Sequence, residues 1–208
     1  MDYKAKIMEE FIRLFVQKDC KEIKVDEIAE NLGISKRTVY ENFSSKVDIV
    51  EQSLKYYQGV AKAQLMEACE KETNPLKKIL ISCYTITINA QHIKVSQFYS
   101  LKKYYPELSA SLLQNFVDFQ VRYMKQCYLQ AQQEGYISKR VDPESMFLLL
   151  VNGERVERQP KIHFMDKEYD TLKLFTAHLF TIIRGVSTLK GVQVCDEYLD
   201  ENFEALMQ

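Results

Sequence analysis

Glycine and proline, the residues that interrupt helices, are scarce in this chain and mark the boundaries between its segments. Only six glycines and four prolines occur among 208 residues, and we expect them to fall between segments of helical periodicity. In the first segment Ile7, Phe11 and Phe15 recur every four residues and form one apolar stripe. We identify no convincing strand and no internal repeat. The sequence therefore predicts an all-α fold.

Local signals set the boundaries of these helices. A short second helix ends at Gly33, which tolerates the left-handed backbone conformation, and Ser35 caps a third helix. Ser45 and Asp48 have the spacing of a capping box and open a long fourth helix, with no flexible linker before about Cys69. Further boundaries are predicted at Asn74–Pro75, Tyr105–Pro106, Gly135 and Asp142–Pro143, followed by a polar loop over Glu157–Lys167 and a last long helix from about Leu172 to Val186.

Three small or branched residues near the second helix have the spacing of a helix-turn-helix. Ala29, Gly33 and Val39 stand at relative positions 0, +4 and +10, where a close helix crossing, a turn and an apolar plug are needed. An ordinary helical hairpin with a solvated charged face is the alternative interpretation. In either case the outer face of the third helix carries mostly polar side chains, namely Ser35, Lys36, Arg37, Thr38, Tyr40 and Glu41.

The charge of the chain does not by itself indicate nucleic-acid binding. The net charge is −1, and residues 1–47 contain nine basic and nine acidic side chains. Locally, Lys36, Arg37 and Lys46 outnumber Glu41, and Tyr40 adds a hydroxyl for phosphate and a ring for thymine methyl groups. These features favour a DNA-reading helix over a solvated hairpin.

The segment Val25–Val50 resembles the DNA-binding domain of the tetracycline-repressor (TetR) family. Its matching anchors are Ala29, Gly33, Ser35, Val39, Tyr40, Phe43 and Lys46. Beyond about residue 54 the similarity is limited to helix number, helix length and the short sequences Tyr-Pro-Glu-Leu and Asp-Pro-Glu at helix boundaries. The resemblance implies a helix-turn-helix DNA-binding domain over residues 1–47 and a helical effector-binding and dimerisation domain over residues 48–208.

The same resemblance assigns expected roles to individual residues. Ser35, Lys36, Arg37, Thr38 and Tyr40 would face the major groove of double-stranded DNA, and Lys46 would bind a phosphate at the start of the fourth helix. Arg37 departs from the family pattern, in which many members have glycine, and could read guanine directly. A homodimer of such domains implies an operator that is an inverted repeat.

The second domain gives weaker signals. Aromatic and amide side chains of the middle helices are candidates for a small-molecule pocket, although core packing is an alternative role for each: Tyr84, Phe98, Tyr99, Phe116, Tyr123 and Asn152. Two apolar stripes are candidates for a four-helix dimer interface, or alternatively for the core of the subunit itself: Phe147, Leu150, Leu172, Phe175, Leu179, Ile182 and Val186. No cluster of charged residues stands out, which favours a largely apolar or aromatic effector.

The remaining composition argues against other classes of protein. Five scattered cysteines without a C-x-x-C pattern suggest reduced thiols, and a redox sensor stays open as an alternative. No acid–base pair, phosphate loop or metal-ligand spacing supports an enzyme, a cofactor or a metal site. Without a signal peptide or membrane-spanning segment, the chain is expected in the cytoplasm. The sequence thus predicts a ligand-released transcriptional repressor, with a DNA-binding protein whose second domain binds a protein partner as the alternative.

Overall fold

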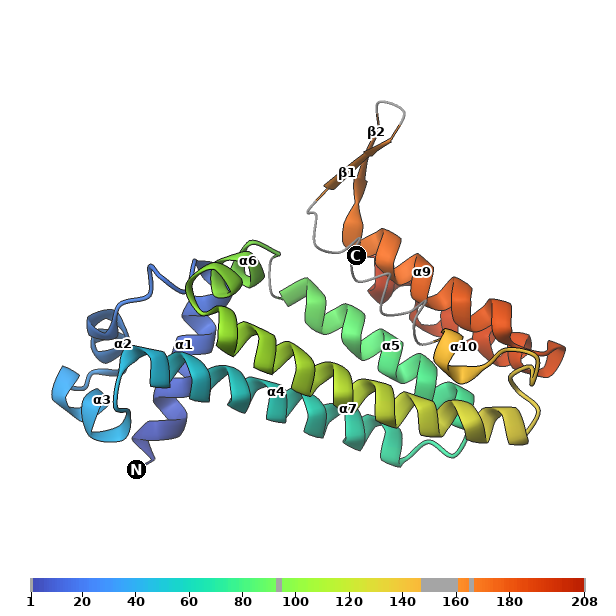
Figure 1. Ribbon diagram of the computed structural model, residues 1–208, viewed down its shortest axis with the longest axis horizontal. Helices are drawn as coiled ribbons and strands as arrows, with labels where there is room; N and C mark the ends of the chain where they lie inside the picture. Colours follow the sequence, from blue (N-terminus) through green and yellow to red (C-terminus); the bar gives the residue numbers. More distant parts are fainter. Residues whose placement is uncertain (1, 93–94, 147–160, 165–166, 208) are drawn as a thin grey trace. The chain divides into compact units, whose positions relative to one another are not determined.

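The computed structural model describes residues 2–92, 95–146, 161–164 and 167–207, and helices make up most of this part of the chain (Figure 1). The all-α fold class is therefore confirmed. The elements are α1 (Tyr3–Gln17), α2 (Val25–Leu32), α3 (Lys36–Asn42), α4 (Lys46–Glu70), α5 (Pro75–His92), α6 (Val95–Tyr104), α7 (Pro106–Gln133), β1 (Lys161–Phe164), β2 (Lys167–Asp170), α9 (Thr171–Val186) and α10 (Leu189–Met207). Within the described ranges, no helix has both the length and the apolar character needed to cross a membrane.

Most helices begin where side chains cap their free amides. Asp2 accepts bonds from the amides of Lys4 and Ala5 at 3.0 and 3.3 Å. The amide oxygen of Asn74 does the same for the amide of Leu76 at 2.9 Å, directly before Pro75. These contacts satisfy amides that have no partner inside the helix. The boundary predicted at Asn74–Pro75 is confirmed.

Helix α4 is continuous from Lys46 to Glu70, as the lack of a linker in the sequence predicts. Its first turn is capped by the Ser45 hydroxyl, which accepts a bond from the Asp48 amide at 3.1 Å. In a simple capping box the carboxylate would accept a hydrogen bond from the amide of the cap residue, Ser45. Here the Asp48 carboxylate instead accepts a hydrogen bond from the amide of Ser44 at 2.8 Å.

Three expectations about the elements are wrong. Three of the six glycines lie inside helices, Gly59 in α4, Gly185 in α9 and Gly191 in α10. Helix α9 is followed by α10, so it is not the last helix, and α5 and α6 divide a segment in which no boundary was predicted. Periodicity reports buried faces, but a helix boundary without glycine or proline leaves little local signal.

A two-stranded hairpin replaces part of the predicted polar loop. Strands β1 and β2 pair in antiparallel fashion, with Lys161 opposite Asp170 and Phe164 opposite Lys167. The prediction that the chain contains no strand is therefore wrong here. Strands of four residues carry too short a periodic signal to be recognised, and hydrogen bonds between the two segments fix them instead.

The chain divides into two compact units that differ from the predicted functional domains. The first unit contains Met1–Ala63 and His92–Phe116, and the second contains Gln64–Gln91 and Val117–Gln208. Helices α4 and α7 each continue from one unit into the other. A compact unit is not the same as a functional domain, so the functional division at residue 47 stays a prediction.

The core of the first unit extends beyond the segment with the helix-turn-helix pattern. Leu101 of α6 and Leu112 of α7 are buried in the same cluster as the apolar stripe of α1. Polar contacts add to this packing: the Gln97 amide donates to the carbonyl of Val16 at 3.0 Å, and the Ser100 hydroxyl lies 3.2 Å from the thiol of Cys20. Helix α6 is thus part of the support for the N-terminal helices.

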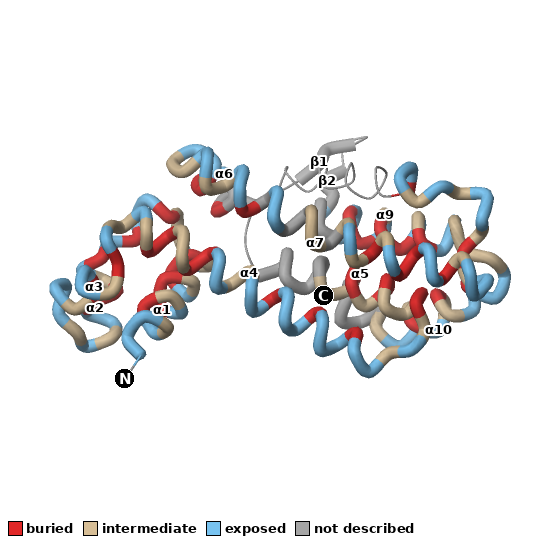
Figure 2. The backbone as a smooth tube through the Cα atoms, turned by 60° about the horizontal axis from the view of Figure 1, so that its bottom comes forward, coloured by how far each residue is buried: buried red, intermediate tan, exposed pale blue. Residues whose placement is uncertain are grey.

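The second unit has its own apolar core, to which α5, α7, α9 and α10 contribute. Buried and exposed positions alternate along these helices, as amphipathic packing requires (Figure 2). Tyr128 is fully buried, and its hydroxyl donates to the carbonyl of Val141 at 3.2 Å. This bond satisfies the one polar group that the side chain carries into the core.

The turn between α9 and α10 is fixed against the end of α7. The amide of Thr188 donates to the carbonyl of Tyr136 at 2.9 Å, and the amide of Ser138 donates to the carbonyl of Val186 at 2.9 Å. A side chain at Gly191 would meet this segment directly, because its Cβ would lie 2.1 Å from the Tyr136 carbonyl oxygen. Gly191 therefore permits a close approach of two backbones.

Candidate nucleic-acid interface

Helices α2 and α3 form the predicted helix-turn-helix. Gly33 adopts the left-handed conformation with φ 64° and ends α2, while the next amide, of Ile34, bonds to the carbonyl of Ala29 at 3.0 Å. Ala29 and Val39 are both buried, the first on α2 and the second on α3. The residues identified by their spacing therefore hold the two helices together.

The exposed side of α3 carries the side chains expected to face DNA. The Arg37 side chain is 89% exposed, and Lys36 and Tyr40 are exposed as well. Ser35 has a second role, because its hydroxyl accepts a hydrogen bond from the Thr38 amide at 3.0 Å and so caps the helix. A rigid helix with basic and aromatic side chains on its outer face can contact base edges and phosphates.

Both basic side chains of α3 have carboxylate partners within the protein. The Lys36 ammonium lies 2.9 Å from the carboxylate of Asp26 on α2, and the Arg37 guanidinium lies 3.1 Å from Glu41 one turn along α3. The hydrogen bond and charge of Asp26 raise the pKa of Lys36. This partner of Lys36 was not predicted, since Asp26 is ten residues away on another helix.

Lys46 begins α4, where a phosphate contact is predicted. Its ammonium donates to the carbonyl of Lys21 at 3.0 Å, and partial burial lowers the pKa of this lysine. An ammonium group has three donors, so this bond leaves capacity for an anion. The phosphate contact of Lys46 stays a prediction.

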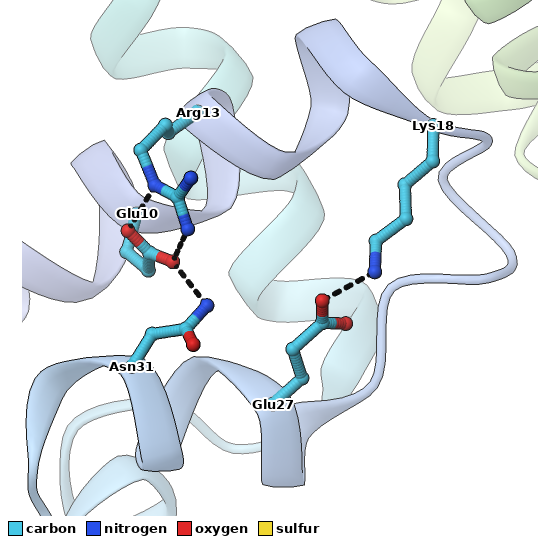
Figure 3. A network of polar contacts seen from close by, with 5 residues as sticks. All are labelled: Glu10, Arg13, Lys18, Glu27 and Asn31. Atoms are coloured by element: carbon cyan, nitrogen blue, oxygen red, sulfur yellow. Dashed lines mark hydrogen bonds and ion pairs between the residues drawn. The ribbon is translucent and has the colours of Figure 1, made fainter.

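A polar network between α1 and α2 holds the helix-turn-helix in place (Figure 3). The carboxylate of Glu10 accepts two bonds from Arg13, at 2.7 and 2.6 Å, and one from the Asn31 side chain of α2 at 2.7 Å. Beside it, Lys18 pairs with Glu27 of α2. This network was not predicted, and its only signal in the sequence was a carboxylate among the apolar residues of α1.

Replacement of Glu10 by glutamine should make the protein less stable at neutral pH but not in acid. The bonds from Arg13 lower the pKa of Glu10, which is buried, against the opposing effect of desolvation. Because the pKa is lower in the folded state, the stabilisation is present above the unfolded value and disappears as pH falls through the folded value. We expect a loss of about 1–3 kcal/mol near pH 7.

Urea denaturation at a series of pH values measures this difference. Glu30→Gln, which removes an exposed carboxylate from α2, serves as the control. A stability difference between wild type and Glu10→Gln that stayed the same from neutral pH down to acid in which the carboxylate is protonated would contradict the role of the Glu10 carboxylate.

The residues predicted to form an effector pocket do not all come together. Tyr84 and Tyr123 both pack against the core of the second unit, whereas Tyr99 belongs to the first unit and is 51% exposed. The side chains of Phe98 and Phe116, and all of Asn152, lie outside the described part of the structure. Only the pair Tyr84 and Tyr123 is therefore placed on one core.

Tyr123 lines a hollow of about 220 Å³ in the second unit, together with Met66, Cys69, Glu70 and Lys78. Burial, and hydrogen bonds with the thiols of Cys69 and Cys127, raise the pKa of Tyr123, so the phenol stays protonated at neutral pH. All five cysteines are buried. The hollow combines apolar, thiol and charged groups.

Part of the predicted dimer surface belongs to the core of the subunit. Phe175 and Leu179 of α9 are 2% and 3% exposed within the second unit, which corrects their assignment to a dimer interface. They belong to one buried cluster with residues of α5, α7 and α10, the last of which was not predicted. Ile182 and Val186 are half-buried against the same core. The side chain of Leu172 and residues Phe147 and Leu150 lie outside the described set.

The inner side of this helix-turn-helix is buried, and its second helix exposes a polar face. Helix-turn-helix DNA-binding proteins have the same arrangement. Residues 7–52 match the family of bacterial regulatory proteins known as the tetR family. Over these residues the chain is similar to the tetR family, and the chain as a whole has the fold of solved tetR-family regulators. No curated protein sequence matches the chain.

Solved regulators share this fold at low sequence identity. A TetR transcription regulator from Haloarcula marismortui is 15% identical, with a TM-score of 0.73 over 90% of this chain and 99% of that one. A transcriptional regulator from Saccharomonospora viridis in complex with choline is 16% identical, with a TM-score of 0.73 over 89% and 97%. FadR from Bacillus subtilis in complex with stearoyl-CoA is 16% identical, with a TM-score of 0.65 over 88% and 98%.

Proposed function

We propose that this protein is a transcriptional repressor that binds an inverted-repeat operator as a homodimer and leaves it when a small molecule binds the second unit. The observation that carries the proposal is the exposure of Lys36, Arg37 and Tyr40 on a helix whose inner side is anchored by buried Val39. Such a helix can enter the major groove with its first residues on base edges. A repressor of this kind acts in the cytoplasm.

The proposed effector site lies in the second unit. The complexes of two regulators with choline and with stearoyl-CoA support the idea that this fold accommodates small ligands. We favour a largely apolar or aromatic effector held near Tyr84 and Tyr123. The hollow beside Tyr123 adds Glu70 and Lys78, which could orient polar groups of that effector.

Selection of genomic fragments by the purified protein is the experiment that tests this function. We expect enrichment of short inverted repeats with half-sites about one helical turn, roughly 34 Å, apart, because each subunit presents one recognition helix. Footprinting of an enriched fragment should then protect both half-sites equally. If no sequence is enriched over the input at moderate salt, the protein is not a sequence-specific regulator.

Effector and operator should each weaken the binding of the other. Helix α4 begins beside the helix-turn-helix at Lys46 and continues into the second unit beyond Ala63, so it provides a covalent path for coupling. A ligand shifts this equilibrium only through a difference in affinity between the DNA-competent and incompetent states. Typical couplings of about 1–3 kcal/mol correspond to a 5- to 150-fold change, equal in both directions.

Calorimetric titration of an identified effector, with and without operator DNA, measures this coupling. Effectors can be found from the thermal shift that they produce in the protein. Equal effector affinities in the two titrations would contradict release. If no small molecule shifts the melting temperature but a protein is retained together with operator DNA, the second unit binds a protein partner instead.

A further inference from the structure

Both basic side chains of α3 lie beside carboxylates of the protein itself. The Lys36 ammonium lies 2.9 and 3.0 Å from the two oxygens of the Asp26 carboxylate. The Arg37 guanidinium lies 3.1 Å from Glu41. Each of the two cations of α3 is therefore matched by one anion, and residues 1–47 as a whole contain equal numbers of basic and acidic side chains.

These two ion pairs contribute little to holding the fold together. All four side chains are more than half exposed, from 53% for Lys36 to 89% for Arg37. Exposed ion pairs of this kind have small effects on folding stability because water and salt screen them. The two helices are instead held by buried Ala29 and Val39. Folding stability therefore does not require the carboxylates of Asp26 and Glu41.

Paired carboxylates change how the two cations respond to DNA. Non-specific binding comes from lysine and arginine side chains that neutralise phosphates and release counterions. A cation already held by a carboxylate releases fewer counterions, and the carboxylate itself is repelled by the phosphates. A specific site can still open the pair, because base edges offer arginine and lysine directed hydrogen bonds in addition to charge.

We propose that Asp26 and Glu41 are specificity determinants that act as internal counter-ions of Lys36 and Arg37 and suppress binding to non-cognate DNA. This inference rests on the proposed DNA-binding function. At the operator the two cations exchange their carboxylates for groups of the DNA. On other sequences the exchange is incomplete, so affinity stays low. A domain with as many acidic as basic residues can then be selective for its site.

The test compares the full-length Asp26→Asn/Glu41→Gln variant with the wild type. Fluorescence anisotropy follows binding to a labelled 30-base-pair duplex of random sequence at a series of potassium chloride concentrations. With both cations released, we expect roughly tenfold tighter binding at low salt. The slope of log K against log salt should steepen by about one for each added phosphate contact, and by no more than about two.

Glu27→Gln is the matched control. It removes one negative charge and one ion pair from the same helix α2, but its partner is Lys18 and not a residue of α3. Circular dichroism melts of each variant verify that it is folded. If Asp26→Asn/Glu41→Gln binds the random duplex no more tightly than Glu27→Gln does, the proposal is overturned.

A second comparison uses a fragment enriched from the genome. The ratio of operator to random-duplex affinity should fall about tenfold in the double variant. An equal gain on both DNAs would show that the carboxylates lower affinity without affecting selectivity, which also overturns the proposal. Failure of the proposed function would appear differently, as a wild-type protein that enriches no fragment at all.

Discussion

Gly191→Ala should lower the melting temperature of this protein by about 6–12 °C. The added Cβ would lie 2.1 Å from the carbonyl oxygen of Tyr136 and 3.0 Å from the Cβ of Ser187. The nearer atom belongs to a backbone that is already bonded to the α9–α10 turn, so it cannot move without breaking that contact. Overpacking of this kind costs about 3 kcal/mol, and each kcal/mol shifts the melting temperature of a chain this long by about 2–4 °C.

Gly59→Ala is the matched control for this substitution. Gly59 also lies inside a helix, but nothing is within 4 Å of a Cβ built at this position. Alanine there should stabilise the protein by about 0.5–1 kcal/mol, because it reduces the entropy lost on folding. Differential scanning fluorimetry measures the melting temperatures of both variants. Similar values for the two would contradict the close approach at Gly191.

Arg37→Ala should weaken operator binding by about 1–3 kcal/mol, or about 5- to 150-fold, and relax the preference at one base step. The Arg37 side chain is 89% exposed and can reach a base edge once it leaves Glu41. Its loss also leaves the Glu41 carboxylate unpaired at the DNA surface. Titration of operator variants, each altered at one base pair, should show a flattened preference at a single position.

Two further variants separate charge from recognition at this helix. Arg37→Lys keeps the charge but loses the planar fork that bonds guanine at two points, so specificity should fall while the salt dependence is retained. Tyr40→Phe removes a hydroxyl and should weaken binding evenly across sequences. Unchanged specific binding by Arg37→Ala at controlled salt would show that α3 does not read the groove.

The helix-turn-helix could be predicted from the sequence because its signals are local. Gly33 ends α2 through its left-handed conformation, and Ser35 caps α3 through an amide three residues away. The buried positions of Ala29 and Val39 follow from the helical period across one short turn. Each of these features depends on residues within about ten positions of one another.

The second unit was predicted less well, for a reason visible in α9. The stripe of Phe175 and Leu179 identifies an apolar face, but periodicity is the same for a face covered by the subunit and for one covered by a partner. Helix α10 packs on α9, and both side chains are buried in a cluster shared by α5, α7, α9 and α10. Which residues remain for a dimer surface therefore depends on the position of α10, a helix that was not predicted.

By itself, the sequence determined the helical class, the helix-turn-helix and the side chains that α3 exposes, since hydrogen bonds and side-chain spacing within one or two turns decide these. Only the tertiary structure decided that Lys36 faces Asp26, that Glu10 joins α1 to Asn31, and that Gly191 meets the backbone of Tyr136. Those contacts join residues 10, 21 and 55 positions apart. Their partners are fixed by how the helices pack, and packing depends on the shapes of all the side chains in a core at once.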